Sequence, residues 1–218
     1  MQDERDEFGA ARNRMVDQQI VARGVEDILV IEAMRRVPRH RFVPPDLRPQ
    51  AYEDHPLQIG CGQTISQPYM VALMTELLVL TKNDHVLEVG TGSAYQAAIL
   101  AELAAAVVTI ERQATLAERA RDTLDELDYE NVEVLSGDGT LGCPERAPFD
   151  AILVTAGSPH VPASLREQLA VGGRLVCPVG GRDVQTLVKV ERTPHGYREH
   201  NNISCVFVPL IGAEGWAD

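Results

Sequence analysis

The second half of the chain alternates short apolar segments with amphipathic ones. "HVLEVG", "VVTIE", "VEVLSGDG", "FDAILVTAG" and "GRLVCPVG" have the composition of strands, and "SAYQAAILAELA", "ATLAERARDTLDEL" and "PASLREQLA" have helical spacing. This order indicates βαβ units, whose strands form a parallel sheet covered by helices on both faces. "QTLVKVER" and "CVFVPL" are expected to be the last strands. We therefore predict a doubly wound, mostly parallel, Rossmann-like α/β core over residues 81–218.

Residues 1–80 predict an N-terminal helical extension packed on that core, so that the whole chain forms one structural domain. Helices are expected over residues 10–23, over "EDILVIEAMRRVP" with Ile28, Ile31 and Met34 facing the core, and over "YMVALMTELLVL". Before the third helix, "IGCGQTISQPYM" breaks strand alternation at two glycines and does not favour a helix until after Pro68. Long connections without regular structure are usually functional or disordered, so we expect this stretch to be a binding loop.

Composition and charge argue against several classes of function. The 218 residues carry a formal net charge of −12, whereas surfaces that bind nucleic acids or anionic membranes are basic. No apolar run reaches the ~18 residues of a membrane span, and "MQDERDEFGAARNR" lacks the apolar core of a secretion signal. The cysteines and histidines form no C-x-x-C or H-x-x-x-H, so we expect no metal site. We expect a cytoplasmic monomer without nucleic-acid or membrane partners.

The turn after the first core strand, "VLEVGTGSAY", is the first candidate binding site. Open α/β sheets bind ligands at the carboxyl ends of their strands, and Gly90 and Gly92 let the backbone approach a ligand closely. The dinucleotide fingerprint G-x-G-x-x-G needs a third glycine where this chain has Tyr95, and there is no P-loop sequence. A tight turn that binds nothing is the alternative.

Three acidic residues lie near the same edge of the predicted sheet. Glu88 is unusual inside an apolar strand; a cationic ligand headgroup would explain it, and satisfaction by backbone amides is the alternative. Glu111 can accept both hydroxyls of a ribose, or it can cap the next helix. Asp138, in "GDG", can accept a hydrogen bond from an adenine amine, or it can serve a plain turn. Together these residues predict a nucleoside without phosphates, a description that fits S-adenosylmethionine.

Longer stretches carry a resemblance to known families. "VLEVGTGSAYQAAILA", "GDG" and "FDAILVTA" resemble the core of class I S-adenosylmethionine-dependent methyltransferases. "DHPLQIGCGQTISQPYMVALMTELL" is similar to the signature of protein-L-isoaspartate (D-aspartate) O-methyltransferases, as are "MVDQQIVARGVEDILVIEAMRRVPRHRFVP", "GGRLVCPVG" and "VFVPL". "GQTISQP" is the most specific part of this resemblance. It implies methylation of the free carboxylate of L-isoaspartyl and D-aspartyl residues in damaged proteins and peptides.

The resemblance also assigns residues. It implies that Ser66 is the catalytic residue, which would orient the substrate carboxylate rather than attack anything; Ser66 also lies in a plausible N-cap region of the helix that follows Pro68. The expected cofactor contacts are Gln63, Thr64, Ile65, Ser66, Glu88, Gly90, Thr91, Gly92, Ser93, Glu111, Arg112, Asp138 and Gly139. The expected substrate contacts are Ile59, Thr64, Ser66, Cys205 and Val206.

Cys205 and Val206 begin "CVFVPL", which we expect to grip the peptide backbone as an edge strand, or else to be simply the last core strand. The chain departs from the family pattern at Ala94, usually Gly, at Thr140, often aromatic, and at Val206, commonly larger or basic. Ala94 would shift the methionine tail of the cofactor slightly, and Thr140 would loosen the adenine pocket. A small-molecule O-methyltransferase and a non-catalytic S-adenosylmethionine-binding module are the alternative functions.

Overall fold

The computed structural model describes residues 2–217. Within them, one seven-stranded sheet has the order β5-β4-β3-β6-β7-β8-β9. Its strands are β3 (His85–Val89), β4 (Ala106–Glu111), β5 (Val132–Ser136), β6 (Phe149–Val154), β7 (Leu169–Gly180), β8 (Gln185–Thr193) and β9 (Gly196–Cys205). The first five strands in that order pair in parallel, and β8 and β9 add to them in antiparallel fashion. The predicted mostly parallel sheet is therefore confirmed.

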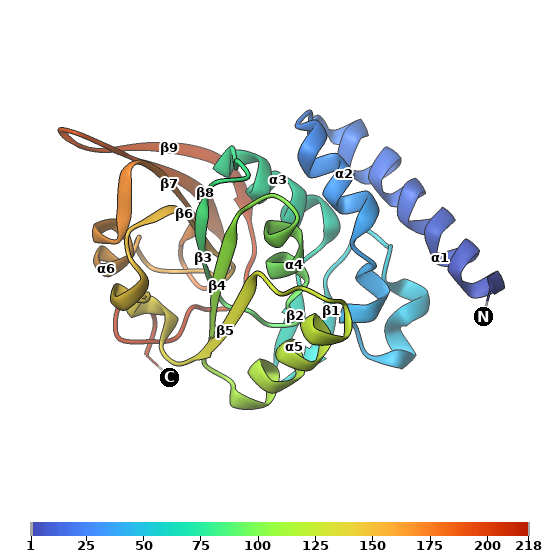
Figure 1. The fold of residues 1–218 in the computed structure, drawn as a ribbon. Coiled ribbons are helices and arrows are strands. Elements are labelled where there is room, and N and C mark those ends of the chain that lie inside the picture. Colours follow the sequence, from blue (N-terminus) through green and yellow to red (C-terminus); the bar gives the residue numbers. More distant parts are fainter. Residues whose placement is uncertain (1, 218) are drawn as a thin grey trace.

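Helices cover both faces of this sheet (Figure 1). One face carries α3 (Pro68–Leu78), α4 (Tyr95–Ala101) and α5 (Ala114–Glu126), and the other carries α6 (Ala163–Glu167) with short 3-10 helices at Gly139–Leu141 and Pro144–Arg146. Successive strand residues point to opposite faces. Val86 accordingly packs in the core cluster under α3 to α5, and Leu87 packs in the second cluster with Leu165 of α6. None of the helices within residues 2–217 is long and apolar enough to cross a membrane.

The N-terminal extension forms an outer layer beyond α3 and α4 (Figure 1). It contains α1 (Gln2–Met15), α2 (Ile28–Arg36), a π-helical turn at Val16–Ile20, and 3-10 helices at Val21–Arg23, Arg39–Phe42 and Pro45–Gln50. The expected place of Ile28 in the core was wrong, because its side chain is 63% exposed. Asp27 caps α2 through its Oδ1, which accepts the Leu29 N–H at 2.8 Å, and this start turns Val30, Ile31, Ala33 and Met34 inward instead.

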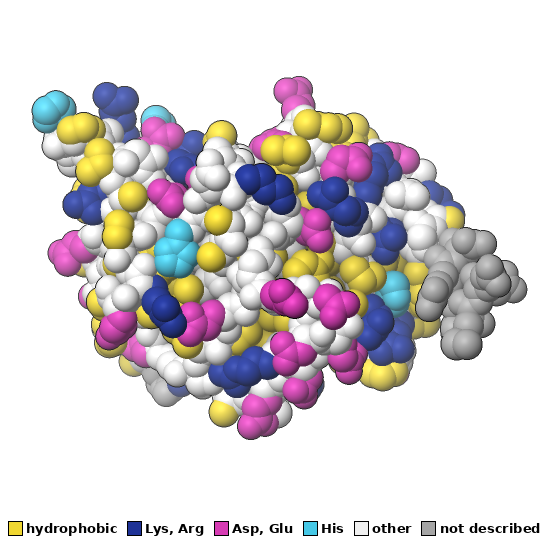
Figure 2. Space-filling model, viewed as in Figure 1, with side chains coloured by type: hydrophobic (Ala, Val, Ile, Leu, Met, Phe, Trp, Pro, Cys, Tyr) yellow, Lys and Arg dark blue, Asp and Glu magenta, His cyan; other side chains and the backbone are white. Residues whose placement is uncertain are grey.

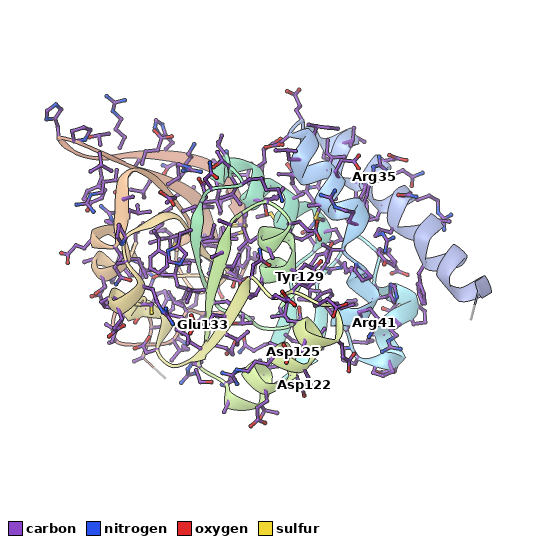
Figure 3. All side chains as sticks on the ribbon, in the orientation of Figure 1. Arg35, Arg41, Asp122, Asp125, Tyr129 and Glu133 are labelled. Atoms are coloured by element: carbon purple, nitrogen blue, oxygen red, sulfur yellow. The ribbon has the colours of Figure 1, made fainter. Side chains whose placement is uncertain are left out.

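Contacts of two kinds hold the extension to the core. Phe42 packs edge-on against Tyr95 of α4, with ring centroids 5.5 Å apart. On the surface, Arg41 Nη2 lies 2.8 Å from Glu126 Oε2 on α5. Figure 3 labels Arg41 in the N-terminal extension and Asp122 and Asp125 on α5. Acidic side chains gather over α5 (Figure 2), so this arginine meets a negative field. Exposed ion pairs of this kind contribute at most ~1 kcal/mol, so the buried aromatic contact matters more.

The stretch expected to be an irregular loop contains a hairpin. β1 (Leu57–Gly60) and β2 (Gln63–Ile65) pair in antiparallel fashion, and α3 begins at Pro68. The glycines do not prevent pairing, because Gly60 ends β1 and only Cys61 and Gly62 form the turn before β2. Gly60 and Gly62 have positive φ values of 92° and 70°, which glycine adopts without strain, and Cys61 also has a positive φ, of 53°. The expectation of irregular structure was therefore wrong for residues 59–60 and 63–65, which lie in the two strands.

The end of the sheet also differs from expectation. The last strand is β9 (Gly196–Cys205), and the expected strand "CVFVPL" leaves the sheet after Cys205. β9 is exposed along nearly its whole length, so it lacks the apolar alternation that would predict a strand. Residues 206–210 instead run past Gly157, whose N–H donates to Val208 O and whose carbonyl accepts the Leu210 N–H, both at 2.8 Å.

Arg174 of β7 fastens the end of α3 to the sheet. Its Nη2 lies 2.6 Å from Asp84 Oδ2 and donates to Val79 O at 2.7 Å. Asp84 also accepts the Thr81 hydroxyl at 2.7 Å. Burial alone would raise the pKa of Asp84, but the hydrogen bonds from Thr81 and Arg174 outweigh it and lower that pKa.

We expect Asp84→Asn to lower the free energy of unfolding at pH 7 by about 1.5–3 kcal/mol, the range for hydrogen bonds to a charged group. Because the folded pKa is lowered, the stabilisation is present above the unfolded pKa of ~3.9 and is lost as pH falls through the folded pKa. Urea denaturation should show a smaller difference in the free energy of unfolding between variant and wild type at pH 3 than at pH 7. Asp183→Asn, at an exposed position, is the control. An equal difference at both pH values would contradict the assignment.

Candidate active site

The carboxyl ends of β3, β4 and β6 open into one cavity, which is partly open to solvent. The turn after β3 and the end of β4 form one side, and β2 with the segment before α3 forms the other. The predicted residues in the wall are Gln63, Thr64, Ile65, Ser66, Gly90, Thr91, Gly92, Ser93, Glu111, Arg112 and Gly139. Ile59, Glu88, Asp138, Cys205 and Val206 are not part of it.

The turn after β3 is fixed by close packing against β6. Gly90 has φ 98°, and a Cβ at this position would lie 2.5 Å from Thr155 Oγ1. The Thr155 hydroxyl donates to Gly90 O at 2.6 Å. Gly90 is therefore required both by its conformation and by this contact. Ala94, where the family usually has glycine, also has a positive φ, of 69°, and it is fully buried at the start of α4.

Glu111 connects the ends of β4 and β3. Its carboxylate is 5% exposed; Oε2 accepts the Gly92 N–H at 2.8 Å, and Oε1 accepts the Gln113 N–H at 2.9 Å. Each carboxylate oxygen has two lone pairs, so each can accept a further hydrogen bond from a ligand. A fixed anionic acceptor in the wall suits a pair of hydroxyl groups, such as those of a ribose.

Glu88 lies behind the wall rather than in it. Its Oε2 accepts the Thr109 hydroxyl at 2.6 Å, and Thr109 Oγ1 lies 2.7 Å from Oγ1 of Thr91, a residue of the cavity wall. Glu88 Oε1 has no hydrogen-bond partner among the described residues. Burial, and to a smaller extent the charge of Glu111, raises the pKa of Glu88 to about 8. The side chain is therefore mostly a neutral acid at pH 7.

Asp138 is occupied by its own chain. Oδ1 accepts the Thr140 N–H at 2.9 Å and the Thr140 hydroxyl at 2.7 Å, and Oδ2 accepts the Ala213 N–H at 2.7 Å. Burial alone would raise the pKa of Asp138, but these hydrogen bonds lower it. Asp138 lines a second hollow with Trp216, next to the main cavity. The adenine contact of Asp138 and the effect of Thr140 on the adenine pocket stay predictions. The Thr140 hydroxyl also accepts the Glu214 N–H of the C-terminal segment at 3.1 Å.

Ser66 is in the cavity wall but does not cap α3. The N-cap residue is Gln67, and it makes no side-chain capping bond, so the expected capping position of Ser66 was wrong. The reason is that α3 begins directly at Pro68, which is favoured at the first helical position. Ile59 packs against the turn after β3, where a Cβ built on Gly92 would lie 3.4 Å from Ile59 Cδ1.

The C-terminal contribution to the wall comes from a segment later than expected. Cys205 ends β9, its thiol donates to Gln185 O at 3.7 Å, and burial raises its pKa to about 11. Val206 is 73% exposed. The wall contains Val208, Pro209, Leu210 and Ile211 instead.

Sequence reasoning also missed wall residues of α3 and α4, namely Val71, Met74, Tyr95 and Gln96. The apolar helical stripe was the only signal for Met74. Among residues 8–217, whose side chains the structure describes, no cluster of three or more His, Cys, Asp or Glu side chains could hold a metal ion.

The raised pKa of Glu88 predicts a pH-dependent stability. Since the folded pKa exceeds the unfolded one, the folded state loses stability as pH rises from ~4.3 to about 8, with a slope of at most ~1.4 kcal/mol per pH unit. Glu88→Gln resembles the protonated acid and should escape this loss. In urea denaturation without ligand at pH 5, 6.5 and 8, the free energy of unfolding of the variant should rise relative to that of the wild type as pH rises. Glu133→Gln, at an exposed strand position, is the control, and its free energy of unfolding should change with pH as that of the wild type does. If the free energy of unfolding of Glu88→Gln also followed the wild type at all three pH values, the assignment would be contradicted.

Comparisons with known proteins agree with this architecture. The family model described as protein-L-isoaspartate (D-aspartate) O-methyltransferase matches residues 10–215. The protein-L-isoaspartate O-methyltransferase 1 of Syntrophobacter fumaroxidans is 58% identical over 96% of this chain and 98% of its own length. The protein-L-isoaspartate O-methyltransferase of Trichlorobacter lovleyi is 57% identical over 96% of this chain and 97% of its own length.

Two solved structures share the fold. A protein-L-isoaspartate O-methyltransferase superposes with a TM-score of 0.83 at 30% identity, covering 94% of this chain and 67% of that one. A Plasmodium falciparum protein solved in complex with S-adenosyl-L-homocysteine gives 0.80 at 24% identity, covering 92% of this chain and 98% of that one, and it supports the fold alone. By the family model and by its relatives, the chain belongs to the protein-L-isoaspartate (D-aspartate) O-methyltransferase family.

Proposed function

We propose that this protein transfers the methyl group of S-adenosylmethionine to the free carboxylate of L-isoaspartyl and D-aspartyl residues in damaged proteins and peptides. The observation that carries this proposal, beside membership of the family, is that a single cavity brings together the turn Gly90–Ser93, the carboxylate of Glu111 and the segment Gln63–Ser66. The first two suit a nucleoside cofactor. The third, on the opposite side, leaves room for a second reactant next to it.

The residues present fit the cofactor. Glu111 would accept hydrogen bonds from the ribose hydroxyls, because its oxygens retain lone pairs beside the two backbone amides they already bind. The turn Gly90–Ser93 would hold the methionine part, and Gly139 the adenine side, where the wall also contains Ile110 and Leu210. Asp138 would accept a hydrogen bond from the adenine amine in addition to the three that its carboxylate already accepts.

Methylation of a carboxylate needs little acid–base chemistry. The substrate is an anion at neutral pH, because its carboxyl pKa is ~4, and the bound cofactor supplies a methyl group on a sulfonium whose departing thioether needs no proton. The protein has to align the reactants and exclude water. Ser66 would donate its hydroxyl hydrogen bond to one carboxylate oxygen and Thr64 would help to place it, while Val71, Met74 and Val208 provide apolar wall.

The substrate contacts outside the cavity are also part of the proposal. Ile59 would act by supporting the wall. Cys205 and Val206, at the end of β9 and just after it, would contact the part of the substrate peptide that extends out of the cavity. We further propose that the protein acts as a cytoplasmic monomer, without nucleic-acid or membrane partners. The exposed acidic face over α5 supports the absence of nucleic acid (Figure 2).

A pair of matched peptides tests the reaction. We expect methyl transfer from S-adenosylmethionine to a peptide that contains one L-isoaspartyl residue, and none to the same sequence with normal aspartate. The reason is that the two peptides carry the free carboxylate on different carbons of that residue. Incorporation of labelled methyl groups measures this. Transfer to neither peptide, with S-adenosylhomocysteine still bound in calorimetry, would overturn the reaction and leave a binding module. Equal transfer to both would overturn the specificity.

The place of Glu111 is tested by binding. Glu111→Ala should weaken S-adenosylhomocysteine by about 10- to 150-fold in calorimetric titration, because it removes a charged hydrogen-bond acceptor worth ~1.5–3 kcal/mol. Glu118→Ala, at an exposed position of α5, is the matched control and should bind normally. Circular dichroism establishes that both variants are folded. An unchanged dissociation constant in folded Glu111→Ala would remove the ribose assignment.

A further inference from the structure

Arg39 is a fully buried cation with no acidic partner among the side chains that the structure describes. Its side chain is 0% exposed; Nε donates to Ala51 O and Nη2 donates to Ser66 O, both at 2.7 Å. The guanidinium lies 4.9 Å from the centre of the Tyr95 ring. Its Nη1 has no hydrogen-bond partner among the described residues. Burial lowers the pKa of Arg39 to about 10, so it stays charged at neutral pH.

Such an arrangement is costly for stability alone. Buried charges in proteins are normally paired with an opposite charge, because desolvation of an unpaired ion is expensive. Two neutral carbonyls and one aromatic ring offset only part of that cost. An apolar side chain of similar length would fill the same volume without it. We therefore look to the groups that Arg39 contacts for a role of its charge other than stability.

One partner is the carbonyl of the predicted catalytic residue. Ser66 is in the cavity wall; Arg39 is not, and Gln67 adjoins the wall as the next residue of the chain. The Ser66–Gln67 peptide bond is trans, since the only cis bond in the described chain is Ala147–Pro148. In a planar trans peptide the C=O and the following N–H point in opposite directions. Because Ser66 O points at Arg39, the Gln67 N–H points away from it, and this N–H makes no backbone hydrogen bond within residues 2–217.

A cation bound to a peptide carbonyl also strengthens the donor on the other side of that peptide, because hydrogen bonds in series polarise one another. Arg39 thus does two things to the segment before α3. It fixes the orientation of the Ser66–Gln67 peptide plane from behind, and it makes the Gln67 N–H a better donor to an anion. Its contact with Tyr95 holds the guanidinium itself in place at the start of α4.

We propose that Arg39 is a positioning residue, which orients and polarises the Ser66–Gln67 peptide group so that the Ser66 hydroxyl and the Gln67 N–H together bind the substrate carboxylate. The inference rests on the proposed function, and it adds to it a second donor and the buried charge that supports both. Arg39 itself touches neither substrate nor cofactor.

Arg39→Lys is the informative variant, because it keeps the charge but can reach only one of the two carbonyls. We expect kcat/KM for the isoaspartyl peptide to fall about 10- to 100-fold, as for loss of a charge-assisted hydrogen bond, while the dissociation constant of S-adenosylhomocysteine changes less than about threefold. In a Ser66→Ala background the same substitution should cost far less, because the two residues act as one unit. Full additivity of the two substitutions would overturn the proposal.

Arg174→Lys is the matched control. Arg174 also donates to backbone carbonyls of a neighbouring element, but it lies at the end of α3 away from the cavity. Arg174→Lys should lower the free energy of unfolding, and it should not lower peptide turnover more than it lowers cofactor binding. If both variants lower peptide turnover and cofactor binding in parallel, Arg39 is merely structural.

A measurement on the wild-type protein avoids any folding defect of the variants. With S-adenosylhomocysteine bound, titration with the isoaspartyl peptide should move the Gln67 amide proton resonance downfield, and titration with the aspartyl twin should not. A Gln67 amide that stays unmoved while the isoaspartyl peptide saturates would overturn the proposal. Failure of the wild-type enzyme to methylate the peptide would instead overturn the proposed function, so the two failures are distinguishable.

Discussion

Neighbouring parallel strands end at the same edge of a sheet, and the rest of the site depends on this constraint. The turns after β3, β4 and β6 meet there and are joined directly: Glu111 accepts the Gly92 N–H, and Thr155 donates to Gly90 O. The hairpin of β1 and β2 then carries residues 63–66 to the same edge from the N-terminal extension. Segments far apart in sequence thereby share one cavity.

Glu111, Glu88 and Arg39 are buried next to this cavity, and their partners differ. Glu111 accepts two backbone N–H groups in the wall. Glu88 has one hydroxyl partner and an unpaired oxygen, and burial favours its neutral form. Arg39 cannot lose its proton at neutral pH and is directed at two carbonyls. The site therefore combines an anionic acceptor, a neutral acid behind the wall and a cation behind the opposite wall.

The sequence predicted the features that depend on local pattern. The glycine turn and Glu111 lie where expected, because strand alternation and the end of a strand can be recognised from nearby residues. The β1–β2 hairpin was missed because its turn contains Cys61 at positive φ, a conformation that no side-chain pattern announces. β9 was missed because it is exposed along most of its length and is specified by pairing with β8. The wall at residues 208–211 depends on contacts with Gly157, some fifty residues earlier in the chain.

The central claim is that one cavity holds the cofactor against Glu111 and the substrate carboxylate against Ser66. A crystal structure of the protein with S-adenosylhomocysteine and an isoaspartyl peptide tests it most directly. The account predicts the ribose at the Glu111 carboxylate and one oxygen of the isoaspartyl carboxylate at ~2.5–3.0 Å from Ser66 Oγ, the usual range for such hydrogen bonds. A substrate carboxylate bound outside the cavity, or a cofactor whose ribose makes no contact with Glu111, would contradict it.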